Sequence, residues 1–227
     1  MDKERAIQNL DNIIAKVEQA RLKISEHHIV QIVAVSKYST VEDIKILYEA
    51  GQRAFGENKV QDLALKSKKL EQYPISWHFI GNLQKNKINQ LIDLEPILMH
   101  SLSSIELAIE LDKRLKTKNK KMNCLLQVNC ANESTKSGVL PDEAVNIYRQ
   151  IKSNYSNINL IGIMTIGAHT DNKEIILKSF NIANQIFQEL QKEFNDTKIC
   201  SMGMSGDYEL AIAEGSNMVR IGSALFS

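Results

Sequence analysis

The sequence has few cysteines and no long apolar run, and each lack excludes a class of protein. Its three cysteines, Cys124, Cys130 and Cys200, have neither the number nor the spacing of a disulfide framework or a metal site. No apolar run approaches the ~18 residues of a membrane-spanning helix, and residues 1–5 do not lead into an apolar signal core. We therefore expect a soluble, cytoplasmic protein with no membrane partner.

The chain also lacks an excess of charge of either sign. Its 28 basic and 27 acidic residues give a formal net charge of +1, which is too little for the basic field that dominates nucleic-acid binding. Two lysine clusters, at 66–69 and 116–121, have no aromatic residues among them and are expected to be solvated surface. We expect no nucleic-acid partner and a small, locally recognised ligand. No large exposed apolar face is indicated, which favours a monomer.

Apolar runs and helical patterns alternate along the chain after an amphipathic opening helix near 3–24. Strands are expected near 31–36, 53–55, 76–80, 97–101, 123–129, 158–164, 198–202 and 217–221. Helices are expected near 41–50, 58–70, 84–92, 103–116, 141–153, 173–193 and 207–214. Eightfold alternation predicts an α/β fold, a single (β/α)8 TIM barrel spanning 1–227 with an additional N-terminal helix that covers the last part of its wall. An open doubly wound sheet is the alternative, although the first helical turn lacks a glycine-rich dinucleotide fingerprint.

Lys37 ends the apolar run 32–37, which is typical of a fully covered parallel strand. An amine must be unprotonated to attack an aldehyde, and apolar surroundings favour the neutral form. The placement therefore suggests a lysine available for a Schiff base. The alternative is that Lys37 marks the point where the strand reaches solvent.

The loops after the seventh and eighth strands carry residues suited to an anion. In such barrels these two loops frequently bind a phosphate group. The first loop holds Met204, Ser205 and Gly206, with one hydroxyl, and the second holds Gly222 and Ser223, where glycine permits close approach of backbone amides. The alternative is a helix cap in the first loop and a simple turn in the second.

Arg220 is expected on the inward side of the last strand, because strand side chains alternate between the two faces. A buried guanidinium needs a partner, and two are open: an internal carboxylate such as Glu57, or a ring nitrogen of a ligand. Lys37 for an aldehyde, two loops for a phosphate and Arg220 for a pyridine nitrogen together describe pyridoxal 5'-phosphate.

Motifs along most of the chain resemble those of the pyridoxal phosphate homeostasis proteins, also called the YggS or PROSC family. They lie at 34–37, 55–58, 77–87, 128–138, 164–167, 201–205 and 219–222. The resemblance implies a single barrel like the N-terminal domain of alanine racemases, with the cofactor covalently linked to Lys37. Lys59 departs from the family, where an aromatic residue is common, and the carboxyl end is short.

Two further residues belong to the expected site. Asn58 would bond the cofactor ring or reach toward Lys37, or alternatively cap the next helix. By resemblance to racemases, Lys136 would approach the cofactor's phenolic oxygen, the alternative being a solvent-facing loop lysine. On the third strand, Trp77 and His78 alternate, so one of them faces the barrel interior, where packing is the simpler role.

No residue is assigned a catalytic role. Racemisation needs two acid/base groups on opposite faces of the substrate, and Lys37 supplies one. The resemblance implies that in racemases the opposing tyrosine comes from a separate domain, which this chain is expected to lack. We expect a non-catalytic carrier that holds pyridoxal phosphate for intracellular vitamin B6 homeostasis, with apo pyridoxal phosphate enzymes as candidate recipients. The alternative is a pyridoxal phosphate-dependent amino-acid racemase or lyase.

Overall fold

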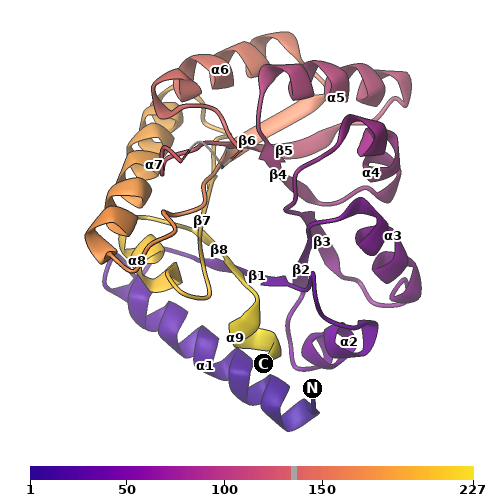
Figure 1. Cartoon of the computed structure of the whole chain (residues 1–227), viewed down its shortest axis with the longest axis vertical. Helices are drawn as coiled ribbons and strands as arrows, with labels where there is room; N and C mark the ends of the chain where they lie inside the picture. The colour runs from indigo at the N-terminus through magenta and orange to yellow at the C-terminus, as the bar shows by residue number, and fades with distance from the viewer. Residues whose placement is uncertain (134–136) are drawn as a thin grey trace.

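Eight parallel strands close into a barrel in chain order over the residues that the computed structural model describes, 1–133 and 137–227 (Figure 1). The strands are β1 Gln31–Val35, β2 Ala54–Glu57, β3 Ser76–Phe79, β4 Leu98–Leu102, β5 Met122–Gln127, β6 Ile158–Met164, β7 Ile199–Met204 and β8 Met218–Ile221. The predicted barrel is confirmed, and the open sheet is wrong because β1 pairs with β8.

Helices surround the barrel and follow the strands as expected. They are α1 Lys3–Leu22, α2 Val41–Glu49, α3 Val60–Lys69, the 3-10 turn η1 Lys85–Lys87, α4 Ile88–Leu94, α5 Ile105–Thr117, α6 Pro141–Asn154, α7 Lys173–Glu193, α8 Tyr208–Ala213 and α9 Ser223–Phe226. Side-chain caps fix where two of the helices begin. Thr40 and Asp43 form a capping box on α2, and the Ser104 side chain accepts a hydrogen bond from Leu107 N on α5. In the described ranges no helix is long and apolar enough to cross a membrane.

The opening helix α1 covers the barrel wall at β1 and β8, as expected. Leu10, Ile13 and Val17 are buried along one stripe of α1 and share a hydrophobic cluster with Ala34 of β1 and Val219 of β8. This burial removes the outer faces of the first and last strands from water, and so stabilises the closure.

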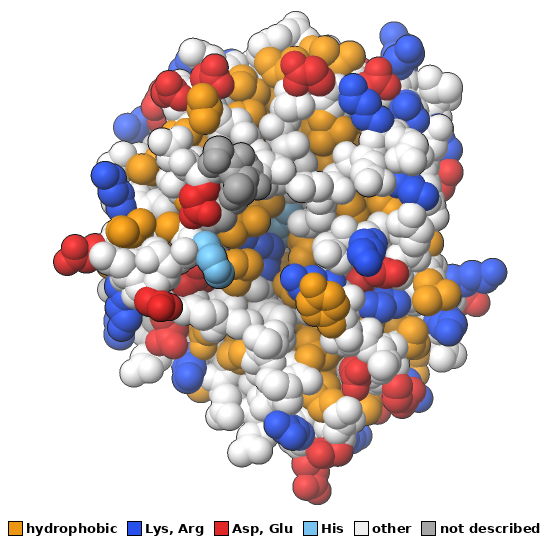
Figure 2. All heavy atoms as spheres, in the orientation of Figure 1, with side chains coloured by type: hydrophobic (Ala, Val, Ile, Leu, Met, Phe, Trp, Pro, Cys, Tyr) orange, Lys and Arg blue, Asp and Glu red, His pale blue; other side chains and the backbone are white. Residues whose placement is uncertain are grey.

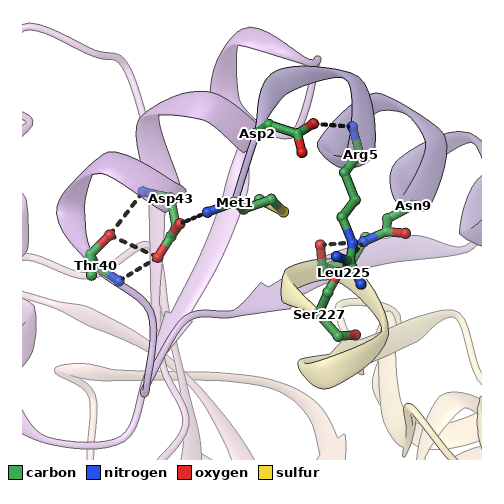
Figure 3. A network of polar contacts seen from close by, with 8 residues as sticks. All are labelled: Met1, Asp2, Arg5, Asn9, Thr40, Asp43, Leu225 and Ser227. Atoms are coloured by element: carbon green, nitrogen blue, oxygen red, sulfur yellow. Dashed lines mark hydrogen bonds and ion pairs between the residues drawn. The ribbon is translucent and has the colours of Figure 1, made fainter.

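The short helix α9 was not predicted, because four residues are too few to show a helical period. The helix is held by α1: Asn9 Nδ2 donates to Leu225 O of α9 at 3.3 Å and to O of the following residue, Ser227, at 2.9 Å. Figure 3 shows these bonds beside a second link, in which the Met1 amine contacts Asp43 Oδ1 at 2.9 Å. Helix α1 is thereby joined to both segments that flank the cleft described next.

Candidate functional site

A cleft of about 630 Å³ opens at the carboxyl ends of β1, β7 and β8. The face of the molecule seen in Figure 2 is hollowed near its middle, where basic and histidine side chains show at the floor between hydrophobic ones. The cleft brings together seven of the nine residues expected in the site. These are Lys37, Met204, Ser205, Gly206, Arg220, Gly222 and Ser223.

Lys37 lies on a turn two residues beyond β1 and is exposed. Its Nζ is 4.9 Å from the ring centroid of Tyr38, whose side chain is itself 89% exposed. Lys37 reaches solvent, as expected for the end of a strand, and it also lines the cleft, as expected for a ligand-binding lysine. It is placed at the rim and is not enclosed by apolar groups.

The backbone immediately before Lys37 is held by a buried ion pair. Ser36 Oγ donates to Glu57 Oε1 at 2.5 Å, and Lys66 Nζ donates to the same oxygen at 2.8 Å and to Ser36 O at 2.7 Å. Lys66 is 7% exposed, so the expectation that the whole 66–69 cluster is solvated surface is wrong for this residue. Its ammonium group is instead the partner of Glu57, which removes Glu57 as a partner for Arg220.

The loops after β7 and β8 are joined by one hydrogen bond, in which Gly222 N donates to Ser205 Oγ at 3.1 Å. Ser205 does not cap α8: the cap position is Asp207, which makes no side-chain cap bond to that helix. A Cβ added to Gly206 would meet no atom within 4 Å, and one added to Gly222 would meet Val35 only at 3.6 Å. Because the Gly222 amide already donates to Ser205 Oγ, the Ser205 hydroxyl and the uncovered backbone of Gly206 are the groups that suit an anion.

Arg220 is 4% exposed and faces the interior, as predicted. One terminal nitrogen donates to Ser201 Oγ at 2.6 Å and the other to Thr165 O at 2.8 Å. Burial lowers its pKa to about 10, while the charge of Asp207 acts in the opposite direction, so the guanidinium remains cationic at neutral pH. The cleft thus has a fixed positive charge in its floor.

Two buried histidines continue from Ser201 across the barrel. His100 Nδ1 lies 3.2 Å from Ser201 Oγ, and His100 Nε2 lies 2.9 Å from His78 Nδ1. Burial lowers the pKa of His78 to about 4 and that of His100 well below its usual range. His78 is the inward residue of β3, whereas Trp77 packs near Phe55 at a centroid distance of 6.1 Å. His100 was not predicted as part of the site, although a polar residue within the apolar strand β4 indicated a buried polar contact.

Two of the expected site residues are not among the described residues that line the cleft. Asn58 lines a separate cavity of about 260 Å³ with Lys59 and Lys87, and it does not cap α3, whose cap position is Lys59. Lys136 lies outside the described residues. The roles expected for both stay predictions.

A closed parallel barrel is the class of fold to which the comparisons also point. The family model for the alanine racemase N-terminal domain matches residues 8–227. The pyridoxal phosphate homeostasis protein of Helicobacter pylori (strain ATCC 700392) is 51% identical over 96% of this chain and 97% of its own length. The chain therefore belongs to the pyridoxal phosphate homeostasis proteins, within the alanine racemase N-terminal domain family.

Solved structures agree with this assignment. A protein of unknown function from Bifidobacterium adolescentis superposes with a TM-score of 0.94 at 29% identity, covering 100% of this chain and 97% of the other. PipY of Synechococcus elongatus, solved with pyridoxal phosphate bound, superposes with a TM-score of 0.79 at 31% identity, covering 93% of this chain and all of the other.

Proposed function

We propose that this protein binds pyridoxal 5'-phosphate in the cleft and holds it covalently on Lys37 as a Schiff base. The observation that carries the proposal is the meeting of Lys37, the bonded pair Ser205 and Gly222, and buried Arg220 in one cleft. Pyridoxal phosphate supplies an aldehyde, a phosphate and a pyridine nitrogen, for which these groups are matched partners. The PipY structure with pyridoxal phosphate bound supports the same choice of ligand.

The cleft fits a ligand of this size and charge. Its volume of about 630 Å³ lies within the range of roughly 300–1,000 Å³ usual for small-molecule sites. Ser205 would donate its hydroxyl hydrogen to the phosphate while its oxygen accepts from Gly222 N, and Gly206 would offer a backbone amide with no side chain beside it. Met204 and Ser223 would form the walls on either side.

The site favours holding the ligand over turning over a substrate. A guanidinium donates a hydrogen bond to a ring nitrogen and keeps its own proton, so Arg220 would leave that nitrogen neutral and a weak electron sink. Tyr38 lines the cleft, but it directly follows Lys37 in the sequence and is almost fully exposed. It is thus not placed as a second acid/base group opposite the lysine. We infer a non-catalytic role in intracellular vitamin B6 balance.

The experiment is absorbance spectroscopy of the protein loaded with pyridoxal phosphate. Wild type is expected to show the imine band, Lys37→Ala to lose it, and Lys59→Ala, a control at an exposed lysine, to keep it. An unchanged spectrum in Lys37→Ala would show that another amine is used.

The alternative, an amino-acid racemase or lyase, is tested by chiral analysis of amino acids incubated with the loaded protein. Conversion of more than one equivalent of amino acid per protein would overturn the carrier role.

We further propose that the protein acts in the cytoplasm as a monomer and passes its ligand to apo pyridoxal phosphate enzymes. The test compares activation of an apo-enzyme by loaded protein with the rate of release into buffer. Activation no faster than release would contradict direct transfer, and a dimer mass in light scattering would contradict the monomer.

A further inference from the structure

A continuous chain of four buried side chains crosses the barrel interior from β8 to β3. Arg220 on β8 donates to Ser201 on β7, Ser201 contacts His100 on β4, and His100 contacts His78 on β3. All four are at most 4% exposed. Only Arg220 among them lines the cleft.

The arginine determines the direction of the other hydrogen bonds. Because Arg220 has no acceptor atom, it must donate to Ser201 Oγ. The serine hydrogen is then free to point at His100 Nδ1, 3.2 Å away. A His100 that accepts at Nδ1 carries its hydrogen on Nε2 and donates it to His78 Nδ1 at 2.9 Å. One buried group, His78 Nε2, is left without a partner among the described residues.

The opposite direction satisfies fewer groups. If His100 donated from Nδ1, Ser201 Oγ would accept two hydrogen bonds and the serine hydrogen would lose its acceptor. Each direction leaves one donor unpaired, the His78 Nε2 hydrogen in the first and the serine hydrogen in the second. The second direction also leaves His78 Nε2 as a bare acceptor without a donor in the described part of the chain, and an additional unpaired buried group is costly. Burial also lowers the pKa of both imidazoles, which keeps each with a single ring hydrogen. The arrangement that runs from Arg220 to His78 is therefore the stable one.

We propose that His100 is a positioning residue that acts through Ser201 to orient Arg220 toward the ring nitrogen of the ligand, with His78 fixing the tautomer of His100. This inference rests on the proposed function. By accepting the serine hydrogen, His100 fixes the rotation of the Ser201 hydroxyl and points an oxygen lone pair at Arg220. Together with Thr165 O, which accepts from the other terminal nitrogen at 2.8 Å, it fixes the plane of the guanidinium.

The test compares the affinity for pyridoxal phosphate with that for its 1-deaza analogue, in which a C–H replaces the ring nitrogen. Wild type is expected to prefer pyridoxal phosphate roughly ten-fold or more, the effect of one hydrogen bond to a charged group. His100→Leu is expected to reduce this ratio to below about three-fold, because the guanidinium loses its fixed plane. His100→Asn is expected to keep the ratio, since its amide oxygen takes the position of Nδ1 and accepts from Ser201.

A purely structural role for His100 would weaken both ligands equally and leave the ratio unchanged, which would contradict the inference while the proposed function stands. A wild type that binds both ligands alike, or neither, contradicts the inference and the proposed arginine contact together. If His100→Leu does not fold, Ser201→Ala breaks the same link with a smaller change. It must also lose the preference for pyridoxal phosphate over the 1-deaza analogue.

Ligand-free protein offers a readout that does not depend on pyridoxal phosphate. Nitrogen-15 NMR is expected to find His100 protonated at Nε2 and bare at Nδ1, and the reverse tautomer would refute the proposed direction.

Discussion

Lys66→Met should destabilise the fold far more than an ordinary substitution on a helix. The change removes the cation from the buried ion pair with Glu57, whose side chain is completely buried and whose other oxygen, Oε2, has no partner among the described residues. Breaking a buried pair from one side costs about 3–5 kcal/mol. Small domains have only ~5–15 kcal/mol of stability, so this variant should approach the limit of folding.

Urea denaturation followed by circular dichroism measures the effect. Lys68→Met is the matched control, because Lys68 is an exposed lysine on the same helix, and it should stay within about 0.5 kcal/mol of wild type. The double variant Glu57→Gln/Lys66→Met removes both charges and keeps an acceptor for the Ser36 hydroxyl. It should recover most of the loss and cost about 1–2 kcal/mol.

A Lys66→Met cost below ~1 kcal/mol would refute the reasoning, because the uncompensated carboxylate is expected to dominate. A double variant as unstable as the single one would refute it too, since the damage would then come from packing and not from charge.

Three other changes have defined outcomes. Burial holds the pKa of His78 at about 4, below the 6.5 of the unfolded chain. As the pH falls, the unfolded chain therefore binds the proton first, and folding stability decreases below pH ~6.5. Between pH 7 and 5.5 the free energy of unfolding of wild type should fall by about 1 kcal/mol more than that of His78→Gln, as measured by urea titration. Gly206→Ala should leave the melting temperature unchanged, because its Cβ meets open space, but should weaken phosphate-bearing ligands by calorimetry; equal affinity would contradict the proposed clasp. Gly81→Ala would place a Cβ 1.9 Å from Asn58 O and should lower the melting temperature markedly; an unchanged melt would argue against that contact.

The parts of the site that depend on strand ends could be predicted from the sequence. In a closed parallel barrel all carboxyl ends share one face, and the pairing of Val33 with Arg220 brings β1 next to β8. A lysine after the first strand and an arginine on the last must then approach the same opening. Knowing the order of the strands was enough for this conclusion.

The buried ion pair could not be separated from a surface lysine cluster by composition. Lys66 stands among three other polar residues at 66–69, but its spacing from Leu63 and Leu70 places it on the buried stripe of α3. Only the packed barrel shows that the carboxylate of Glu57 lies where that stripe passes Ser36.

The buried hydrogen-bonded chain from Arg220 to His78 could not be predicted from the sequence, for a different reason. His78 and His100 are 22 positions apart, and His100 and Ser201 are 101 apart, so no local pattern links them. His78 and His100 lie on the neighbouring strands β3 and β4, whereas the contact of His100 with Ser201 crosses the interior from β4 to β7. Both contacts depend on which strand residues alternate inward once the barrel has closed. Asn58 differs again: its motif predicts a place in the cofactor site, and the structure shows this residue lining a cavity other than the cleft.

The most direct measurement of the central claim is the site of covalent attachment. Protein loaded with pyridoxal phosphate is reduced with borohydride, digested, and mapped by mass spectrometry. The account predicts one phosphopyridoxyl group per chain, on the peptide that contains Lys37. Label on Lys66, on Lys136 or spread over surface lysines, with Lys37 unmodified, would contradict it.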